Sequence, residues 1–496
     1  MNSISTALTL DRGRFGISLP AIIGLCAYYV VVSHPIKILH DPDTYLHIAV
    51  GRWILAHHQV PHHGIFSFTM ANAPWVAHEW LGEIILASLF DYFGWIGLLA
   101  VTGLVFAAAT AMLFRALLRY LAPAHALLAG MLACTLAMPH LLTRPHILTL
   151  PILVLWAAEL VRARTEDRPP PLWLTGLMVL WANIHGGYMF GLVFAALLAG
   201  EATLTAADWR VRMVAVRGWG LFCGTALIAA LITPFGIEGL LLPLRLTQMS
   251  FALSVLEEWR SPNFQVFQPL EVWIVFVLFG ALSMRWKLPV TRVGIVLLLV
   301  HMALQHGRHG ELVGFVAPLL LAPSLSHQLD RPVEGALGLR VDRFMAELAK
   351  PASAGGRILV GLALAALTAF SLRVDIAQNL DAIAPRAALG VVKTNDVTGP
   401  VLNAYGFGDY LIFSGIEPFV DGRAELYGDA FISRYVDALL GVSDQLPVLL
   451  NEYGITWTLL DPNTPSARLL DYLPGWRRLY ADDVAVVHVR VGPGAH

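Results

Sequence analysis

Residues 16–36, GISLPAIIGLCAYYVVVSHPI, form an almost unbroken apolar run, which is closely followed by Leu39-His40-Asp41-Pro42-Asp43-Thr44-Tyr45-Leu46-His47. A helix needs about 20 mostly apolar residues to cross a bilayer. The first stretch has that length, and the second places two carboxylates directly after it. Together they predict a membrane-spanning helix with an acidic motif at its end.

The rest of the chain has the same apolar character. Hydrophobic residues make up 57% of the 496 residues, charged residues make up 14%, and the mean hydropathy is +0.64. An average soluble domain has about 25% charged and 45–50% apolar residues. Lys and Arg (33) nearly balance Asp and Glu (35), so the basic excess of a nucleic-acid-binding protein is missing. Composition therefore excludes a soluble globular protein, a disordered chain and a nucleic-acid partner, and it predicts an α-helical polytopic membrane protein.

Eleven apolar segments are candidates for membrane spans. They lie at 16–36, 94–114, 123–139, 146–161, 172–184, 188–206, 218–234, 269–284, 293–306, 311–327 and 357–373. Lys and Arg collect in short cytoplasmic loops. Up to residue 357, alternate connecting segments hold eighteen basic residues, whereas the opposite segments hold six. This alternation predicts eleven spans, with the N-terminus in the cytoplasm and the C-terminus outside.

The last part of the chain, 374–496, differs from the apolar part at 1–373. Short apolar runs typical of buried strands alternate there with segments of helical spacing. The strand candidates are Pro400–Leu402, Ile455–Leu460 and Val484–Val489, and the helix candidates are Ile432–Leu440 and Gln445–Tyr453. We expect a small extracytoplasmic α/β domain at 374–496 and a transmembrane domain at 1–373, whose first outer loop covers 37–93.

Polar residues gather on the predicted outer side. Thirteen of the 18 histidines lie in or beside outer segments. Ionisable residues at membrane depth are costly and tend to be functional. The asymmetry predicts a single site that faces outward.

The motif Asp41-Pro42-Asp43 is the first candidate for that site. Pro42 biases Asp41 toward extended geometry, and Asp43 or Thr44 is expected to cap a helix over 43–56. Asp43 and His47 would then share a helix face. Asp41 and Asp43 could bind a divalent cation, Mg²⁺ or Mn²⁺, through oxygen ligands, or one of them could take a proton from an attacking hydroxyl. The structural alternative is a helix cap with interfacial charge.

Further candidates come from the other outer segments. Arg144, Arg260 and Arg308 oppose the positive-inside tendency, and a guanidinium offers a fixed fork of donors to phosphate. We expect these arginines, with His309, to bind the phosphate of a donor; the alternative is Arg–Glu pairing between helices, such as Arg260 with Glu257. The candidates for acceptor binding or for support of the acids are His47, His78, Glu79 and His185. The histidine tract at 57–63 is more simply an interfacial segment than a metal site.

The chain resembles the GT-C superfamily of membrane glycosyltransferases. The resemblance is carried by Asp41-Pro42-Asp43-Thr44 after the first span, by Trp75-Val76-Ala77-His78-Glu79-Trp80-Leu81 and by Trp181-Ala182-Asn183-Ile184-His185-Gly186-Gly187. Within the superfamily these stretches look like a group of bacterial inner-membrane proteins of poorly defined substrate.

The resemblance implies a multi-pass enzyme of the bacterial inner membrane that takes a sugar from a polyprenyl-phosphate carrier and acts on the outer face. It also implies that Asp41 or Asp43 is the catalytic or metal-binding acid and that outer Arg or His residues hold the lipid phosphate. We expect an inverting transfer to a lipid, glycan or protein. The chain lacks a Trp-Trp-Asp-Tyr-Gly acceptor motif, so asparagine glycosylation is not expected. The alternative function is a non-catalytic transporter or an assembly factor for envelope polysaccharide.

Overall fold

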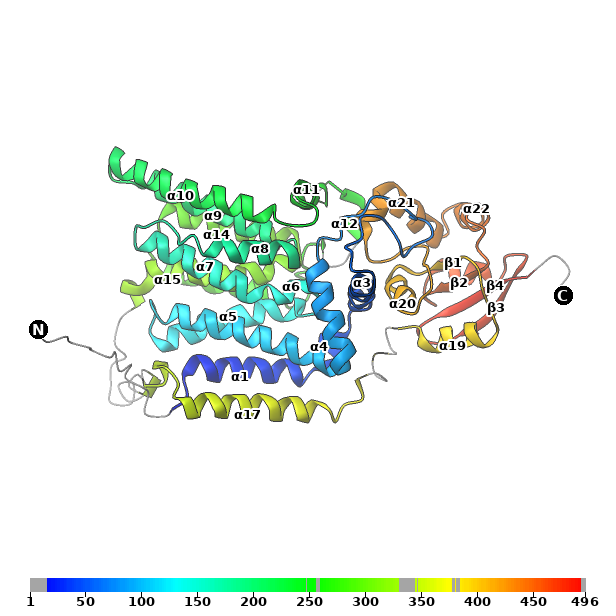
Figure 1. The fold of residues 1–496 in the computed structure, drawn as a ribbon, viewed down its shortest axis with the longest axis horizontal. Coiled ribbons are helices and arrows are strands. Elements are labelled where there is room, and N and C mark those ends of the chain that lie inside the picture. The colour runs from blue at the N-terminus through cyan, green and yellow to red at the C-terminus, as the bar shows by residue number, and fades with distance from the viewer. Residues whose placement is uncertain are drawn as a thin grey trace, which may run out of the picture.

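The computed structural model describes residues 16–246, 248–255, 259–329, 344–345, 347–376, 380 and 384–491. The molecule is mostly helical and has a small strand-containing region near its C-terminus. Figure 1 shows an elongated molecule with a helical bundle at one end and the strand-containing region at the other. Helix α3 lies between the two, and this placement brings the acidic motif to their interface.

The bundle and its outer connections are built from helices of very different lengths. In chain order they are α1 (Leu19–Val32), α2 (Pro35–Leu39), α3 (Asp43–His57), α4 (Trp80–Leu117), α5 (Pro123–Ala137), η1 (Met138–His140), α6 (Pro145–Leu148), α7 (Leu150–Thr165), α8 (Leu174–Ile184), α9 (Tyr188–Leu204), α10 (Trp209–Ala230), α11 (Ile237–Leu246), α12 (Ser250–Val255), α13 (Pro269–Ser283), α14 (Val290–Gln305), η3 (Gly307–His309), α15 (Gly310–Leu329) and α17 (Ala354–Ser371).

A helix covers most of each of the eleven segments that the sequence predicts as spans. Within the described residues, four helices are long and apolar enough to cross a bilayer, namely those at Trp80–Leu117, Trp209–Ala230, Gly307–Leu329 and Ala354–Ser371. Five further apolar helices are shorter. The chain is therefore a multi-pass membrane protein, whereas the number of crossings and their direction stay predictions.

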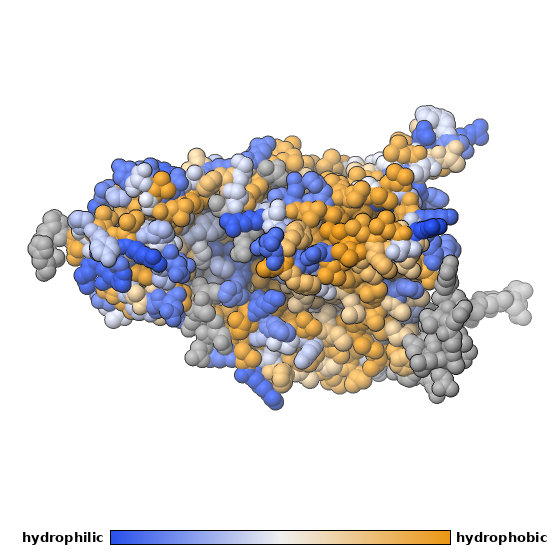
Figure 2. Space-filling model, turned by 180° about the vertical axis from the view of Figure 1, so that it is seen from behind, coloured by the Kyte–Doolittle hydropathy of each residue, from blue (hydrophilic) through white to orange (hydrophobic). Residues whose placement is uncertain are grey.

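The surface agrees with this assignment. Figure 2 shows a broad hydrophobic area over the helical bundle, with hydrophilic side chains at both of its ends and over the strand-containing region. Large apolar side chains such as Leu282, Val290 and Leu362 are more than half exposed. Such a belt is costly in water and favourable in lipid.

Helix α4 is bent at Gly94, which has φ 59° and ψ −155°. A residue without a Cβ adopts this positive φ most readily. The part before the bend, which begins at Trp80, lies across the end of the bundle, and the part after it runs within the bundle (Figure 1). This first part belongs to the first outer loop, and the part after the bend matches the span predicted at 94–114.

The strand-containing region has one four-stranded sheet in the order β1-β2-β4-β3. Its elements are α19 (Arg386–Thr394), β1 (Val401–Asn403), η5 (Tyr405–Phe407), α20 (Gly408–Phe413), α21 (Ala424–Leu439), α22 (Gln445–Glu452), β2 (Trp457–Leu460), α23 (Pro465–Leu470), β3 (Trp476–Ala481) and β4 (Val486–Arg490). Strands β1 and β2 are parallel, and the other two pairs are antiparallel. The three predicted strands and both predicted helices are confirmed. The sequence interpretation missed β3, whose Arg477 and Arg478 are exposed at the edge of the sheet.

Helix α3 is fixed between the bundle and the strand-containing region by aromatic packing. The buried Tyr45 ring makes edge-on contacts with Trp95 of α4, at 5.3 Å between ring centroids, and with Tyr410 of α20, at 5.0 Å. Burial of an aromatic side chain contributes about 1.5–3 kcal/mol. The rest of α3, including its acidic start, is thereby held in one position relative to both parts.

Candidate active site

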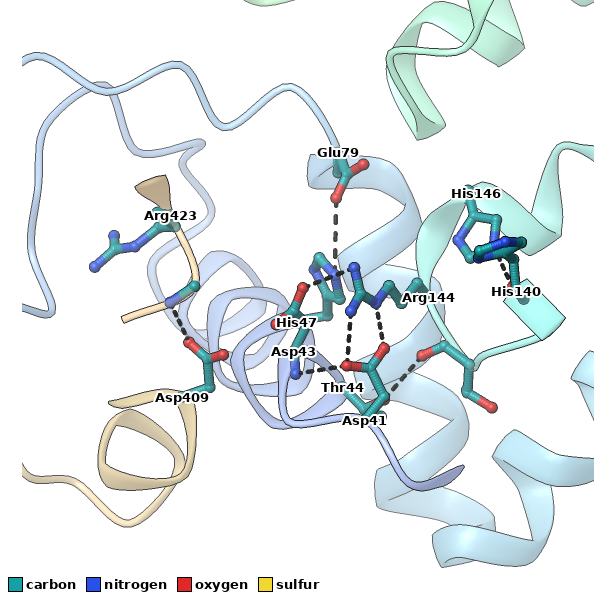
Figure 3. Close-up of polar contacts among 12 residues, drawn as sticks. Asp41, Asp43, Thr44, His47, Glu79, His140, Arg144, His146, Asp409 and Arg423 are labelled. Carbon is teal, nitrogen blue, oxygen red and sulfur yellow. Dashed lines mark hydrogen bonds and ion pairs between the residues drawn. The ribbon is translucent and has the colours of Figure 1, made fainter. Parts of the chain in front are cut away.

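Arg144 joins the two aspartates of the acidic motif (Figure 3). Its Nε and Nη2 donate to the two carboxylate oxygens of Asp41, with 2.9 Å from Nη2 to Oδ1, and its Nη1 lies 3.0 Å from Oδ2 of Asp43. The Asp41 side chain is 1% exposed, whereas the Asp43 side chain is 28% exposed. A bidentate guanidinium–carboxylate pair fixes geometry strongly. Asp43 is therefore the acid of the pair that an external group can reach.

Local structure holds this arrangement in place. Pro145 occupies the first position of α6. Two residues earlier, the Thr143 N–H donates to Ile38 O near the end of α2, at 3.2 Å. The hydroxyl of Thr44 in turn donates to Thr143 O at 3.0 Å.

The prediction that Asp43 or Thr44 caps the helix is wrong: α3 begins at Asp43, and Asp41 Oδ1 accepts the Asp43 N–H at 3.2 Å. The proline in the motif lets the preceding acid serve the helix start.

A second group of polar side chains surrounds Glu79, just before α4. The Nε2 atoms of His47, His78 and His185 lie 3.8, 3.7 and 3.5 Å from its carboxylate oxygens. The four residues predicted for acceptor binding or support are thus brought together, and His47 lies one helical turn after Asp43. Asp43 and His47 lie on the same helix, so the two groups adjoin each other at α3, and we call them together the polar surface.

Burial changes the proton affinity of these groups. Burial alone would lower the pKa of His47, but the hydrogen bond to Glu83 and the charges of Glu79, Glu83 and Asp43 outweigh it and raise the pKa. Burial first, and then His146 and Arg308, hold the pKa of His185 well below its usual range. Of these two histidines, His47 is thus the one that carries a positive charge more readily.

The other predicted phosphate ligands gather around Trp259. The Arg308 guanidinium stacks on its ring at 4.6 Å, and His309 lies against the same ring. The Nδ1 atom of His309 lies 3.3 Å from Met302 O, so that atom is engaged with the backbone of α14. Arg260 is exposed and donates to Ser254 O at 3.0 Å, while its alternative partner Glu257 lies outside the described residues.

The sequence interpretation missed Asp409, at the start of α20. Its side chain is 1% exposed, and its Oδ1 accepts the Gly422 N–H at 2.9 Å. Burial first, and then the charges of Asp43 and Asp421, raise the pKa of Asp409 well above its usual range. The only sequence signal was a single acid directly before the apolar run Tyr410-Leu411-Ile412-Phe413.

The polar stretch Asp421–Asp429, which had no predicted role, closes this side of the interface. Arg423 Nη2 donates to Asp421 Oδ2 at 2.6 Å, and the guanidinium stacks on Trp75 at 4.6 Å. Figure 3 shows that Arg423 points away from Asp43. Arg423 therefore ties the first outer loop to the strand-containing region.

A groove of about 530 Å³ runs beside Glu79. Its lining combines Trp80 and Leu81 of α4 with residues of α8, including Leu180 and Asn183, and with Ile232 from the segment after α10. Trp80 Nε1 donates to Asn183 Oδ1 at 2.8 Å. This hydrogen bond holds two polar side chains in place in a lining that is otherwise mostly apolar. An apolar chain that entered along this groove would arrive beside the polar surface.

A divalent cation does not fit the arrangement of Asp41 and Asp43. Both oxygens of Asp41 and one of Asp43 already face the Arg144 guanidinium. Among the described residues, no group of three or more His, Cys, Asp or Glu side chains is arranged to hold a metal ion. A metal ion at the acid pair would have to displace an arginine, so no step is assigned to one.

The fold matches solved membrane enzymes at very low sequence identity. Archaeal oligosaccharyltransferase AglB from Archaeoglobus fulgidus, solved with an inhibitory peptide and a dolichol-phosphate, aligns with a TM-score of 0.51 at 9% identity over 88% of this chain and 69% of its own. The chain has the GT-C fold. At this identity the likeness concerns the fold alone.

Weaker matches to the GT-C fold are also found. They are ArnT from Cupriavidus metallidurans bound to undecaprenyl phosphate, with a TM-score of 0.47 at 14% identity over 96% of this chain and 98% of its own, and arabinofuranosyltransferase AftD from Mycobacteria, with 0.44 at 14% over 95% and 41%. No family model and no curated protein matches the sequence.

Proposed function

We propose that this chain is a membrane glycosyltransferase of the bacterial inner membrane. It would move a sugar from a polyprenyl-phosphate carrier to an acceptor hydroxyl outside the cytoplasm. The GT-C fold and the apolar bundle support a lipid-linked donor. The observation that carries the proposal is the arrangement of the acid pair, in which Arg144 fixes a buried Asp41 and leaves Asp43 accessible.

In this mechanism Asp43 is the general base. The acceptor oxygen attacks the anomeric carbon and passes its proton to the Asp43 carboxylate, while the bond from that carbon to the carrier phosphate breaks. Attack opposite the leaving phosphate inverts the anomeric centre. Asp41 makes no contact with the reacting atoms; it orients Arg144, and Arg144 orients Asp43. A positioned base contributes about 10²–10⁴-fold to a rate.

The leaving phosphate needs a positive partner as its charge develops. Arg144 contacts Asp43, and Arg308 is close enough to lower the pKa of His185, so both are candidates for that partner. The carrier chain would lie in the groove lined by Trp80, Leu180 and Ile232. These positions support a phosphate site between the acid pair and the cluster around Trp259.

The test uses the purified full chain in detergent, with polyprenyl-phosphate sugars labelled in the sugar and a membrane extract as the source of acceptor. We expect label to leave the carrier and free polyprenyl phosphate to form. Asp43→Asn should lower this rate by at least a hundredfold, because the amide cannot take the proton. The matched control is Asp483→Asn, which removes an exposed carboxylate from the turn before β4.

Two outcomes count against the proposal in different ways. If Asp43→Asn keeps the wild-type rate, the base is misassigned. If the wild-type chain consumes none of the carrier sugars but moves them across a proteoliposome membrane, the chain is a transporter.

A further inference from the structure

Asp409 belongs to the strand-containing region, yet its carboxyl faces Asp43 of the first outer loop. A Cβ built on Gly422 would lie 2.8 Å from Asp409 Oδ2 and 3.1 Å from Asp43 Oδ1, so both side chains crowd the same point above this glycine. Asp43 acts on Asp409 by its charge, and the two side chains lie within hydrogen-bonding reach of each other. Two carboxyl groups can share a hydrogen bond only if one of them carries a proton.

The hydrogen bonds around Asp409 indicate which group carries it. Oδ1 of Asp409 accepts the Gly422 N–H at 2.9 Å, which leaves Oδ2 for the hydroxyl. Asp43 already faces Arg144 at 3.0 Å, which favours its ionised form. This arrangement fits a neutral Asp409 whose Oδ2 hydroxyl is turned toward an ionised Asp43.

The other charged groups around Asp409 act in the same direction. Asp421, from the loop before α21, adds a negative charge, but that charge is bound by Arg423 and by the Tyr427 hydroxyl at 2.7 Å. Tyr405 of η5 also lies within reach of Asp409. On the side of α3, the cations Arg144 and His47 lie behind Asp43. No cation is shown to bind Asp409 directly among the described residues, so ionisation there would leave its charge uncompensated.

We propose that Asp409 is a positioning residue that donates a hydrogen bond from the C-terminal region to the base Asp43 and so completes the active site across the interface. This inference rests on the proposed function, because it deepens the description of the same site. Asp43 is then held from two sides, by Arg144 from the bundle and by Asp409 from α20. Positioning of a base to within about 1 Å can change a rate by 10²-fold.

The first experiment compares three proteins in the sugar-transfer assay: wild type, Asp409→Ala and Asp409→Asn. The asparagine amide can still donate to Asp43 and its carbonyl can still accept from Gly422, so Asp409→Asn should recover most of the tenfold or greater loss expected of Asp409→Ala. Wild-type activity should fall as the pH rises through the pKa of Asp409, because a second negative charge would repel Asp43. Asp409→Asn should lack that fall.

The second experiment needs no activity and follows the midpoint of thermal unfolding of the full chain against pH. The pKa of Asp409 is raised in the folded protein, so its contribution to stability is present below the unfolded value of 3.8 and is lost as the pH rises through the folded pKa. Asp409→Asn should unfold at nearly the wild-type midpoint in acid and at a higher midpoint at neutral pH. Asp483→Asn should show no such trend.

The outcomes separate this inference from the proposed function. If the wild type transfers no sugar but the two midpoints diverge with pH, the neutral Asp409 stands and the glycosyltransferase assignment falls. If the wild type is active and Asp409→Asn shows the same alkaline loss as the wild type, or Asp409→Ala keeps full activity, the positioning role is wrong. A pH-independent difference in midpoint would also overturn it.

Discussion

At the scale of single residues, the decisive feature is the different exposure of two neighbouring acids. Asp41 and Asp43 are separated by one proline, yet only Asp43 remains accessible, because the Arg144 fork takes both oxygens of Asp41. A buried carboxylate without its cation is strongly unfavourable. Arg144 therefore stabilises the fold by compensating the buried charge of Asp41, besides any contact with phosphate.

This leads to a prediction for Arg144→Met. The variant should lose about 3–5 kcal/mol of stability, because Asp41 would stay buried and uncompensated. The double variant Arg144→Met, Asp41→Asn should regain much of that stability but not the transfer activity. Thermal unfolding of the full chain and the sugar-transfer assay measure the two effects.

The matched control is Arg52→Met. Arg52 pairs with Asp91, but both side chains are 40% exposed, so the loss should be below about 1 kcal/mol. If Arg144→Met and Arg52→Met lose the same stability, the buried Arg144–Asp41 pair contributes no more to stability than the exposed Arg52–Asp91 pair.

At the scale of elements, the close packing of α3 on the first part of α4 places the acid pair beside Glu79. Gly51 allows this approach: a Cβ there would lie 2.1 Å from Glu83 O and 2.7 Å from the Ala87 Cβ. Backbone atoms cannot move aside as a flexible side chain can. The spacing of α3 and α4 therefore depends on the absence of a side chain at position 51.

We predict that Gly51→Ala separates the two helices and lowers stability by about 1–3 kcal/mol, as overpacking does. Transfer activity should fall as well, because Asp43 and His47 move with α3. Gly224→Ala in α10 is the control, since nothing lies within 4 Å of its added methyl group. Wild-type stability and activity in Gly51→Ala would contradict this account of the helix contact.

At the scale of the whole molecule, the strand-containing region is tied to the outer segments of the bundle at several points. Thr69 Oγ1 donates to Phe419 O at 2.6 Å, and Asp429 accepts the N–H groups of Phe251 and Ala252 at 3.1 and 3.0 Å. These contacts, with Arg423 against Trp75, close the interface in which Asp43 lies. The candidate site is thus a property of both parts together.

We predict that Asp429→Ala loosens the segment around α12, because its first N–H groups lose their acceptor. Limited proteolysis of the full chain should cut between residues 246 and 268 faster than in the wild type. Asp437→Ala, further along α21, is the control. Equal cleavage rates for Asp429→Ala and the wild type would mean that this contact does not hold the segment.

The sequence alone determined the membrane class, the positions of the apolar helices, most of the small sheet and the resemblance to the GT-C superfamily. The first three follow from composition and periodicity, which are local properties of the chain, and the resemblance is carried by short motifs such as Asp41-Pro42-Asp43-Thr44. It also singled out Asp41, Asp43, Arg144 and the residues around Glu79. It could not connect them, because Asp41 and Arg144 are far apart along the chain.

Only the tertiary structure decided which acid is accessible, that Arg144 rather than a metal ion lies between the aspartates, and that Asp409 joins them. These depend on burial and on contacts between distant segments, and no spacing in the sequence encodes either one. A lone aspartate in an apolar run such as Gly408–Phe413 carries no signal of its own. It becomes significant only when folding removes it from water and brings it against a second carboxylate.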